Sequence, residues 1–391
     1  MDVAELRELL SPEGLRLLDE VGTIDSSQDV VRTVSRLRAA GHSGALVAAV
    51  LGQARLRAKA VPKFGDFAAR MLFTPDGLEQ ATRLRVAALH AGRFGEAGVD
   101  VVADLGCGIG ADALAFAALD LGVIAVERDE LTAAVAAYNL APFPSARVEL
   151  ADAESTDLTG VGGVWLDPAR RAGGTRLEDP ADWSPRLEWA FEVARGRPTG
   201  IKLGPGLDRG LIPEDCEAQW VSVDRDVVEL VLWFGAVARP GVRRAALVLG
   251  DSGAAELVAD GDSADAEAGP LRRYLLEPDG SVIRARLIGD LARRVGGRMI
   301  DPTIAWISCD EAPQTPFGQA FEVIERFPLD VKTLKRELAA RDIGVLEVKK
   351  RGVDVDPAEF RRRLGLRGTQ SATLILTRVA GERVAILAER V

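Results

Sequence analysis

Hydrophobic positions recur at helical spacing over the first 95 residues of the chain. Leucines that lie three, four or seven positions apart form one apolar face, and a second series of valines with Leu37 follows. The segment Ser11-Pro12-Glu13 is typical of a helix start, with serine as the N-cap and proline at the first helical position. The pattern predicts a helical N-terminal domain over residues 1–95.

Beyond residue 98 the apolar positions become continuous runs. Four of these runs are typical of parallel strands that are buried on both faces: 99–105, 123–127, 161–167 and 199–203. Three helices are also predicted, over 111–119, 130–140 and 183–195, and a late strand is predicted over 227–234. This alternation predicts an open α/β sheet over residues 96–250, with its ligand site at the carboxyl ends of the strands.

The last third of the chain has its own pattern. Residues 254–270 are rich in Asp, Gly, Ala and Ser without a period, and we expect a loop or a surface excursion there. Residues 271–391 predict a small α/β domain with two helices and three strands: helices 333–341 and 357–364, strands 345–349, 372–378 and 384–389.

Charge is distributed unevenly between these parts. The chain of 391 residues has 49 basic and 59 acidic residues, a formal net charge of −10. Residues 271–391 contain 22 Lys and Arg against 17 Asp and Glu, a local net charge of +5. An acidic total argues against nonspecific coating of nucleic acid, whereas the local surplus allows one basic docking face.

The cysteine and histidine content excludes several classes of site. Three dispersed cysteines without a C-x-x-C pair argue against a disulfide scaffold and a cysteine-based zinc site. With only two histidines, no metal site is expected. The N-terminus lacks the apolar segment of a signal peptide, and no apolar stretch approaches the ~20 residues of a membrane span. We therefore expect a cytoplasmic protein.

A glycine-rich turn follows the first predicted strand, in the segment Asp104-Leu105-Gly106-Cys107-Gly108-Ile109-Gly110. Glycine permits positive φ angles and lets a ligand approach the backbone, and the N–H groups that open the next helix favour an anionic group. Gly106, Gly108 and Ala111 also fit the pattern for a nicotinamide dinucleotide, with Glu127 at the distance expected for its ribose contact. The turn alone therefore leaves two cofactors open, a nicotinamide dinucleotide and S-adenosylmethionine.

Three further features favour S-adenosylmethionine. Asp104 can orient an ammonium group, which this cofactor has and a nicotinamide dinucleotide lacks. After the third strand, Asp152 can accept an adenine amino hydrogen while the backbone N–H of Ala153 meets the ring. The third feature is the segment that closes the fourth strand, Leu166-Asp167-Pro168-Ala169-Arg170.

The glycine turn resembles the D-x-G-x-G-x-G motif of class I S-adenosylmethionine-dependent methyltransferases, whose sheet is Rossmann-like. The resemblance implies that the three glycines hold the methionine part of the cofactor. It also implies that Glu127 binds the ribose hydroxyls and that Asp152 binds the adenine. Methyl transfer from a sulfonium needs positioning and exclusion of water, and no metal.

The segment Asp167-Pro168-Ala169-Arg170 is similar to the (D/N)-P-P-(F/Y/W/R) motif of amino-group and RNA-base methyltransferases. Asp167 and the carbonyl of Pro168 can accept the two hydrogens of an exocyclic amine and so direct its lone pair. Ala169 replaces a proline of the motif and no aromatic residue follows, which leaves the target atom open. Arg170 is a candidate for a phosphate or base contact.

Two further basic residues are candidate substrate contacts: Arg171 in the same loop and Lys202 at the end of the fifth strand. Arg170 also resembles the last residue of the D-P-P-R motif of uracil-C5 methyltransferases, which need a cysteine nucleophile. The segment Ile307-Ser308-Cys309 matches their cysteine motif only superficially, because it lies outside the predicted methyltransferase sheet. We therefore expect no covalent cysteine catalysis.

Three segments together resemble one bacterial family of RNA methyltransferases with a C-terminal THUMP-like domain: 73–82, 167–171 and 344–377. THUMP domains bind RNA, so the resemblance implies that basic residues of the last segment contact RNA phosphates: Lys349, Lys350, Arg351 and the cluster Arg361–Arg363. By position, the segment from Phe73 to Gln80 precedes the first strand and is expected to cover the cofactor.

These observations predict a three-part enzyme that methylates a base nitrogen in tRNA or rRNA. Two alternatives stay open. A small-molecule or protein methyltransferase is favoured by the overall acidity and by the missing aromatic residue after Asp167. The other alternative is a catalytically silent RNA-binding protein that keeps the cofactor for stability. The presence of all four acidic residues of the site argues against it: Asp104, Glu127, Asp152 and Asp167.

Overall fold

The computed structural model describes residues 2–24, 26–169, 171–172, 175–176, 179–251 and 253–391. They divide into two compact units, the first made of residues 1–203 and 232–238 and the second of residues 204–231 and 239–391. The three domains predicted from the sequence, 1–95, 96–250 and 271–391, have other boundaries than these two units and stay predictions.

The first unit begins with helices, as expected. They are α1 (Val3–Leu9), α2 (Pro12–Val21), α3 (Ser27–Ala39), α4 (Gly44–Phe64), the 3-10 helix η1 (Gly65–Arg70), α5 (Pro75–Gln80) and α6 (Leu84–Glu96). Ser11 is the N-cap of α2, where its hydroxyl accepts a 3.0 Å hydrogen bond from the N–H of Gly14. Among the described residues, no helix has both the length and the apolar character needed to span a membrane.

Five parallel strands of the first unit form a sheet in the order β3-β2-β1-β4-β7. Their bounds, and those of the helices that follow them, are β1 (Val101–Leu105), α7 (Ala111–Ala118), β2 (Gly122–Glu127), α8 (Glu130–Leu140), β3 (Ala146–Leu150), β4 (Gly163–Leu166), α9 (Leu187–Gly196) and β7 (Thr199–Leu203). The strand order reverses between β1 and β4. In an open α/β sheet, ligands bind at the carboxyl ends of the strands beside such a reversal.

The division between the units falls within β9 (Asp226–Phe234), whose last residues lie beside β7. In the second unit the order continues from β9 through β8 (Glu217–Val223) and β10 (Arg244–Gly250) to β11 (Gly253–Ala259). The expectation of a loop over residues 254–270 was therefore wrong for residues 254–259, which pair antiparallel with β10. Leu257 is the one buried residue of this edge strand, so the sequence shows no apolar period.

The rest of the second unit is a seven-stranded sheet in the order β13-β14-β12-β15-β18-β17-β16, with four helices. The elements are β12 (Tyr274–Pro278), α10 (Gly280–Arg284), α11 (Ile288–Arg294), β13 (Arg298–Asp301), β14 (Ile304–Cys309), β15 (Gly318–Pro328), α12 (Val331–Ala340), β16 (Ile343–Lys350), α13 (Pro357–Leu364), β17 (Gln370–Val379) and β18 (Glu382–Arg390). The two helices and three strands predicted after residue 330 are confirmed, whereas β12 to β15 were not predicted.

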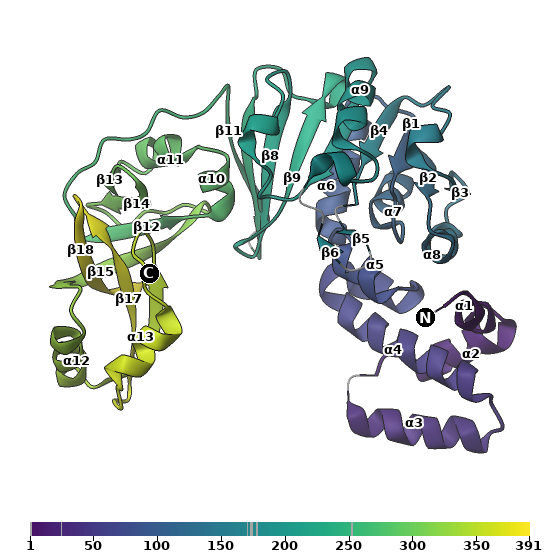
Figure 1. The fold of residues 1–391 in the computed structure, drawn as a ribbon, viewed down its shortest axis with the longest axis horizontal. Coiled ribbons are helices and arrows are strands. Elements are labelled where there is room, and N and C mark those ends of the chain that lie inside the picture. The colour runs from purple at the N-terminus through teal and green to yellow at the C-terminus, as the bar shows by residue number, and fades with distance from the viewer. Residues whose placement is uncertain (1, 25, 170, 173–174, 177–178, 252) are drawn as a thin grey trace. The chain divides into compact units, whose positions relative to one another are not determined.

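Helices α12 and α13 pack on one face of this second sheet (Figure 1). Leu334 and Leu338 of α12 and Phe360 of α13 are buried in one core with Leu374 of β17. The next residue of β17, Ile375, points to the opposite core. Since α12 and α13 bury one side against the sheet, their other sides, which include Lys335 and Arg362, are exposed.

An extended segment of the first unit, from Met71 to Phe73, is hydrogen-bonded by buried side chains. Gln53 of α4 bonds both the N–H and the carbonyl of Phe73, at 3.0 and 2.7 Å. Asn139 of α8 accepts from the N–H of Leu72 and donates to its carbonyl. The amide of Asn139 also donates to the carbonyl of Ile109, at 2.9 Å, so this segment is fastened to the glycine turn.

Candidate functional site

The residues singled out in the first unit lie at the carboxyl ends of its parallel strands. Asp104 is the fourth residue of β1, Glu127 is the last of β2, and Asp167 follows the last residue of β4. Asp152 lies just after β3, and Lys202 is the fourth of the five residues of β7. Since β1 and β4 flank the reversal of strand order, these residues lie at the edge of the sheet where a ligand site is expected.

The glycine turn between β1 and α7 has the backbone that its composition predicts. Gly106, Gly108 and Gly110 have φ angles of +87°, +55° and +83°, which side chains with a Cβ rarely adopt. A Cβ on Gly106 would lie 3.1 Å from the carbonyl oxygen of Asp167, so the turn also passes close to the end of β4. A Cβ on Gly108 would meet no atom within 4 Å, so open space lies over this glycine.

Asp104 is a buried carboxylate without a partner. The residue is 1% exposed, and neither carboxylate oxygen has a hydrogen-bond partner in the part of the chain that the structure describes. Burial, reinforced by the charges of Asp112 and Asp167, raises the pKa of Asp104 well above its ordinary value. An unpaired buried carboxylate is costly, and a cationic ligand that donates hydrogen bonds would remove that cost.

Glu127 is held against the same turn. One of its oxygens accepts a 3.1 Å hydrogen bond from the N–H of Gly108, and the other accepts a 2.9 Å bond from the N–H of Asp129. These two bonds fix the carboxylate at the end of β2 and leave further lone pairs on both oxygens. A carboxylate fixed in this way can accept hydrogen bonds from a pair of hydroxyl groups.

Asp152 is exposed at the end of β3 and begins the 3-10 helix η2 (Ala153–Ser155). One of its oxygens accepts a 2.8 Å hydrogen bond from the N–H of Glu154. The second oxygen remains able to accept from an amino group of a ligand, and the backbone of Ala153 lies beside it. The position agrees with the expectation for an adenine contact, which stays a prediction.

Asp167 is paired with Lys202. The Lys202 Nζ lies 2.5 Å from Asp167 Oδ2, and the two side chains are 12% and 34% exposed. Pro168 is buried directly after Asp167. The contact brings together two residues that were predicted separately, and it gives Lys202 a role in holding the Asp167 carboxylate.

Of the two arginines that follow this segment, only Arg171 is described, and only its backbone. Arg170 lies outside the described residues. Arg171 belongs to the short strand β5 (Arg171–Ala172), which pairs with β6 (Thr175–Arg176), and its side chain is outside the description. The predicted contacts of both arginines therefore stay predictions.

A buried polar cluster beneath the turn was not predicted. Asp112, in the first turn of α7, accepts hydrogen bonds from Thr82 Oγ1 at 2.7 Å and from His90 Nδ1 at 2.9 Å. Although burial opposes it, the His90 bond and the charge of Lys202 lower the pKa of Asp112. The His90 ring stacks on Trp165 of β4 with the centroids 4.4 Å apart. No sequence signal joins these residues, because they come from three separate elements.

Lys63 of α4 was also not singled out from the sequence. Its ammonium donates to the carbonyls of Leu78, Glu79 and Ala81 at the end of α5, at 2.7–2.9 Å. Burial, together with the charges of Arg83 and Lys202, lowers the pKa of Lys63 to about 8. This lysine fixes the end of the segment predicted to cover the cofactor.

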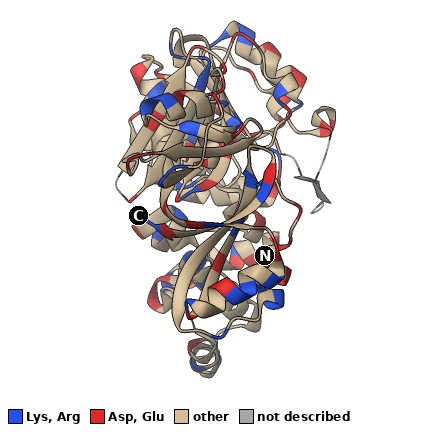
Figure 2. Cartoon of the chain, turned by 90° about the vertical axis from the view of Figure 1, so that its left-hand side faces the viewer, with Lys and Arg blue, Asp and Glu red and all other residues tan. Residues whose placement is uncertain are grey.

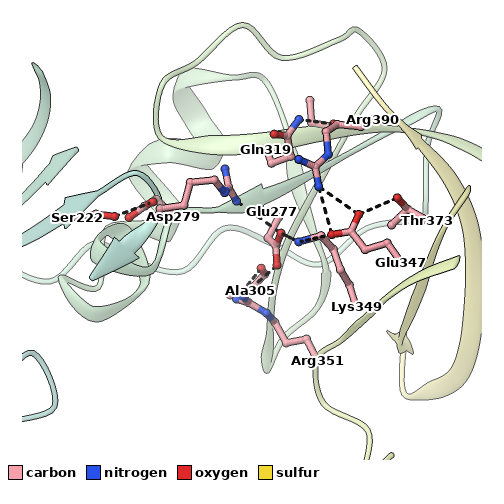
Figure 3. A network of polar contacts seen from close by, with 12 residues as sticks. Ser222, Glu277, Asp279, Ala305, Gln319, Glu347, Lys349, Arg351, Thr373 and Arg390 are labelled. Atoms are coloured by element: carbon pink, nitrogen blue, oxygen red, sulfur yellow. Dashed lines mark hydrogen bonds and ion pairs between the residues drawn. The ribbon is translucent and has the colours of Figure 1, made fainter. Parts of the chain in front are cut away.

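Two of the predicted phosphate contacts of the second unit, Lys349 and Arg351, lie in an internal ion-pair network (Figure 3). Glu277 of β12 is paired with Lys349 at 2.7 Å, with Arg351 at 3.7 Å and with Arg225 at 3.6 Å. Arg351 also donates to the carbonyl of Ala305. Lys350 alone of the three neighbouring residues points to solvent. The contacts of Lys349 and Arg351 to RNA stay predictions, although both have partners in the chain.

The three cysteines are free and buried. Burial, with the charges of Asp104 and Glu127, raises the pKa of Cys107 well above its ordinary value. Burial likewise raises the pKa of Cys216 to about 12 and that of Cys309 to about 11. A thiol with a raised pKa is a poor nucleophile at neutral pH, which agrees with the expectation of no covalent cysteine catalysis. Within the described ranges, no group of His, Cys, Asp and Glu could hold a metal ion.

Comparison with known proteins gives matches over most of the chain. Residues 318–390 match the family model "THUMP domain-like", and residues 2–60 match "Domain of unknown function (DUF8688)". An uncharacterised S-adenosylmethionine-dependent methyltransferase of Mycobacterium tuberculosis, from strains CDC 1551 / Oshkosh and H37Rv, is 34% identical over 333 residues. The match covers 83% of this chain and 90% of the relative.

A solved structure shares the fold over the whole chain. This crystal structure, described as that of a methyltransferase from Porphyromonas gingivalis W83, aligns with a TM-score of 0.71 and 19% identity. The alignment covers 100% of this chain and 99% of the other. At this identity the likeness concerns the fold.

The residues at the glycine turn fit S-adenosylmethionine. The carboxylate of Asp104 lacks the hydrogen-bond donor that the ammonium of this cofactor supplies. No atom lies within 4 Å of the Cβ position of Gly108, so a side chain at this residue would project into that open space. Both observations concern the methionine part of the cofactor, and the fixed carboxylate of Glu127 suits the ribose hydroxyls.

Replacement of Gly108 by alanine tests this assignment, with Gly98→Ala as the matched control. Both glycines have positive φ, and neither Cβ would meet an atom within 4 Å, so each variant should lose about 1–2 kcal/mol of stability. In Gly108→Ala the methyl group projects into the proposed cofactor space, and we expect at least a tenfold loss of affinity for S-adenosylhomocysteine by calorimetry. Gly98→Ala should bind as the wild type does. Equal affinities would contradict the assignment of this space.

Proposed function

Because the chain belongs to the S-adenosylmethionine-dependent methyltransferases, in the bacterial family with a C-terminal THUMP-like domain, we propose that it methylates a base nitrogen in RNA. The observation on which this proposal mainly rests is the position of Asp167. Asp167 and Pro168 directly follow β4, next to the glycine turn, and the Asp167 carbonyl oxygen lies 3.1 Å from the Cβ position of Gly106. An amine held by Asp167 therefore lies beside the cofactor site.

The cofactor side of the proposal uses the residues described above. Asp104 binds the ammonium, the three glycines line the methionine part, Glu127 binds the ribose hydroxyls and Asp152 with Ala153 binds the adenine. When bound, the cofactor supplies an electrophilic methyl group on a sulfonium sulfur. The protein contributes orientation, exclusion of water and a carboxylate of fixed position.

On the acceptor side, Asp167 and the carbonyl of Pro168 each accept one hydrogen of an exocyclic amine and turn its lone pair toward the pocket. The nitrogen that gains a methyl group loses one proton, and the Asp167 carboxylate is placed to take it. Lys202 keeps this carboxylate in position through the 2.5 Å contact. We propose Arg170 and Arg171, in the loop that follows, as contacts to the base or its phosphate.

RNA is the proposed substrate for two reasons. The THUMP domain-like match over residues 318–390 relates the second unit to a class of RNA-binding modules, by analogy. Residues 271–391 also have a net charge of +5 within an acidic chain. We place the reaction in the cytoplasm, where the free cysteines would remain reduced.

A small-molecule or protein acceptor is the second candidate function. It is favoured by the net charge of −10 and by Ala169, which stands where the RNA-base motif has proline and is not followed by an aromatic residue. Such a residue would stack on an extruded base.

Label transfer distinguishes the two candidates. The purified protein is mixed with S-adenosylmethionine labelled in the methyl group and with a cell extract from a strain that lacks the gene. Our proposal expects label in material that is sensitive to ribonuclease and resistant to protease. Label in protein or in small molecules alone would contradict it in favour of the second candidate, and no transfer to any fraction would favour a catalytically silent protein.

A further inference from the structure

The second unit has a cluster of exposed basic side chains at the end of α13. We define the α13 basic surface as the residues Lys335, Arg361, Arg362, Arg363 and Arg367, all of which are exposed. A Cβ on Gly365, the C-cap of α13, would lie 3.6 Å from Lys335 Nζ and 3.9 Å from the carbonyl oxygen of Arg362. Lys335 of α12 therefore stands at the end of α13, and the two helices contribute to one surface.

The charge of these two helices is not balanced within the unit. Together, α12 and α13 contain six basic and two acidic residues, a net charge of +4. Of the acidic residues, Glu337 is already paired with Arg336 and Arg341, and Glu359 lies in the first turn of α13, at its opposite end. In the part of the chain that the structure describes, no residue of the α13 basic surface forms an ion pair.

Most other cations of the unit are paired. Lys349, Arg351 and Arg225 surround Glu277, and Arg390 is bound to Glu347 (Figure 3). Further pairs join Arg326 to Glu382 and Arg341 to Glu325. Basic and acidic segments are accordingly interspersed along the ribbon in Figure 2. The α13 basic surface thus differs from most of the cations of its unit.

We propose that the α13 basic surface, which extends the predicted cluster Arg361–Arg363 by Lys335 and Arg367, binds the phosphates of the substrate RNA in place of Lys349 and Arg351. The inference rests on the proposed function and names the surface that docks the substrate. The planar guanidinium group offers several donors to a phosphate, and the three adjacent arginines are exposed and available. Lys349 and Arg351 would first have to leave Glu277, which is only 15% exposed and would lose two of its three partners.

The position of the arginines in the last turn of α13 also stabilises the helix itself, because cations interact favourably with the C-terminal end of the helix dipole. That effect is confined to the last turn of a helix. It does not account for Lys335 on the neighbouring helix or for Arg367 beyond the end of α13. A polyanion that contacts both helices accounts for all five.

The test compares RNA binding by full-length variants at graded salt. The variant Arg361→Gln/Arg362→Gln/Arg363→Gln removes three charges from the surface. The matched control, Arg36→Gln/Arg243→Gln/Arg383→Gln, removes three exposed charges from other elements. Filter binding uses total tRNA and rRNA from the deletion strain as the probe, and thermal melting confirms that each variant is folded.

We expect the α13 variant to bind RNA at least tenfold more weakly than the wild type near physiological salt. The slope of log K against log salt should become shallower by about 2–3, because each phosphate contact contributes about 0.7–0.9 to the slope. The control should behave as the wild type does. Unchanged binding by the α13 variant would overturn the inference, as would an equal loss in the control or in a Lys349→Gln/Arg351→Gln protein.

The outcome is distinct from that of the proposed function. If the wild type transfers label to RNA while the α13 variant binds RNA normally, the inference fails and the proposed function stands. If the wild type binds RNA through this surface but methylates only another class of acceptor, the proposed function fails. A wild type that binds no RNA at any salt concentration contradicts both.

Discussion

Replacing Asp104 by asparagine is expected to stabilise the cofactor-free protein and, in the same variant, to weaken cofactor binding strongly. Among the described residues the buried carboxylate has no hydrogen-bond partner, and an uncharged amide of the same size avoids the cost of burying a negative charge, which we expect to stabilise the protein by about 1–3 kcal/mol. The ammonium of the cofactor loses its counter-charge, and we expect the dissociation constant of S-adenosylhomocysteine to rise about 100-fold, or about 2.7 kcal/mol. Urea unfolding and calorimetry measure the two effects.

The pH dependence of this variant provides an independent check. Because the pKa of Asp104 is raised in the folded protein, protonation of this group favours folding, and its contribution to stability is lost as the pH rises through the folded pKa. The advantage of Asp104→Asn over the wild type should therefore be largest at neutral pH and should shrink as the pH falls toward 3.8, the ordinary pKa of Asp. An advantage that grows with acidity, or an asparagine variant that is less stable at pH 7, would contradict this account of Asp104.

Replacing Asp167 by asparagine is expected to stop catalysis without preventing cofactor binding. The variant keeps the size of the side chain but cannot take a proton, and it loses the ion pair with Lys202. Loss of a positioned proton acceptor typically lowers the rate by about 10²–10⁴-fold. We expect a fall of this size in the single-turnover rate of methyl transfer, with the affinity for S-adenosylhomocysteine changed by about threefold or less.

The matched control for this variant is Asp157→Asn, which changes an exposed aspartate in the loop between β3 and β4. It should leave both rate and affinity unchanged. An Asp167→Asn protein that retains most of its activity would remove Asp167 from the proposed mechanism. A loss of cofactor affinity as large as the loss of rate would assign the residue to the cofactor site instead.

Much of the candidate site could be predicted from the sequence because its signals are local. The glycine turn, the acidic residue at the end of each apolar run and the helix starts are each defined within about ten residues. Alternation of apolar runs and helices specifies parallel strands, and parallel strands bring their carboxyl ends to one edge. Asp104, Glu127 and Asp167 are therefore predicted to converge, and the structure places them at that edge.

The remaining features depend on contacts between residues far apart in the sequence. Asn139 bonds Leu72 across 67 residues, and Lys349 is paired with Glu277 across 72 residues. A run of lysines and arginines has the same appearance in the sequence whether an acidic partner is present or absent in the fold. The sequence therefore led to the prediction of phosphate contacts at both basic clusters, 349–351 and 361–363, and could not show that Lys349 and Arg351 are paired with Glu277 in the fold.

The most direct test of the proposed function compares modified nucleosides in RNA from strains with and without the gene, by mass spectrometry. Our account predicts that one nucleoside methylated on a base nitrogen is present in tRNA or rRNA of the parent strain and absent from the deletion strain. It should reappear when the purified wild-type protein, but not Asp167→Asn, is added with S-adenosylmethionine. Identical sets of methylated nucleosides in the two strains would contradict the account.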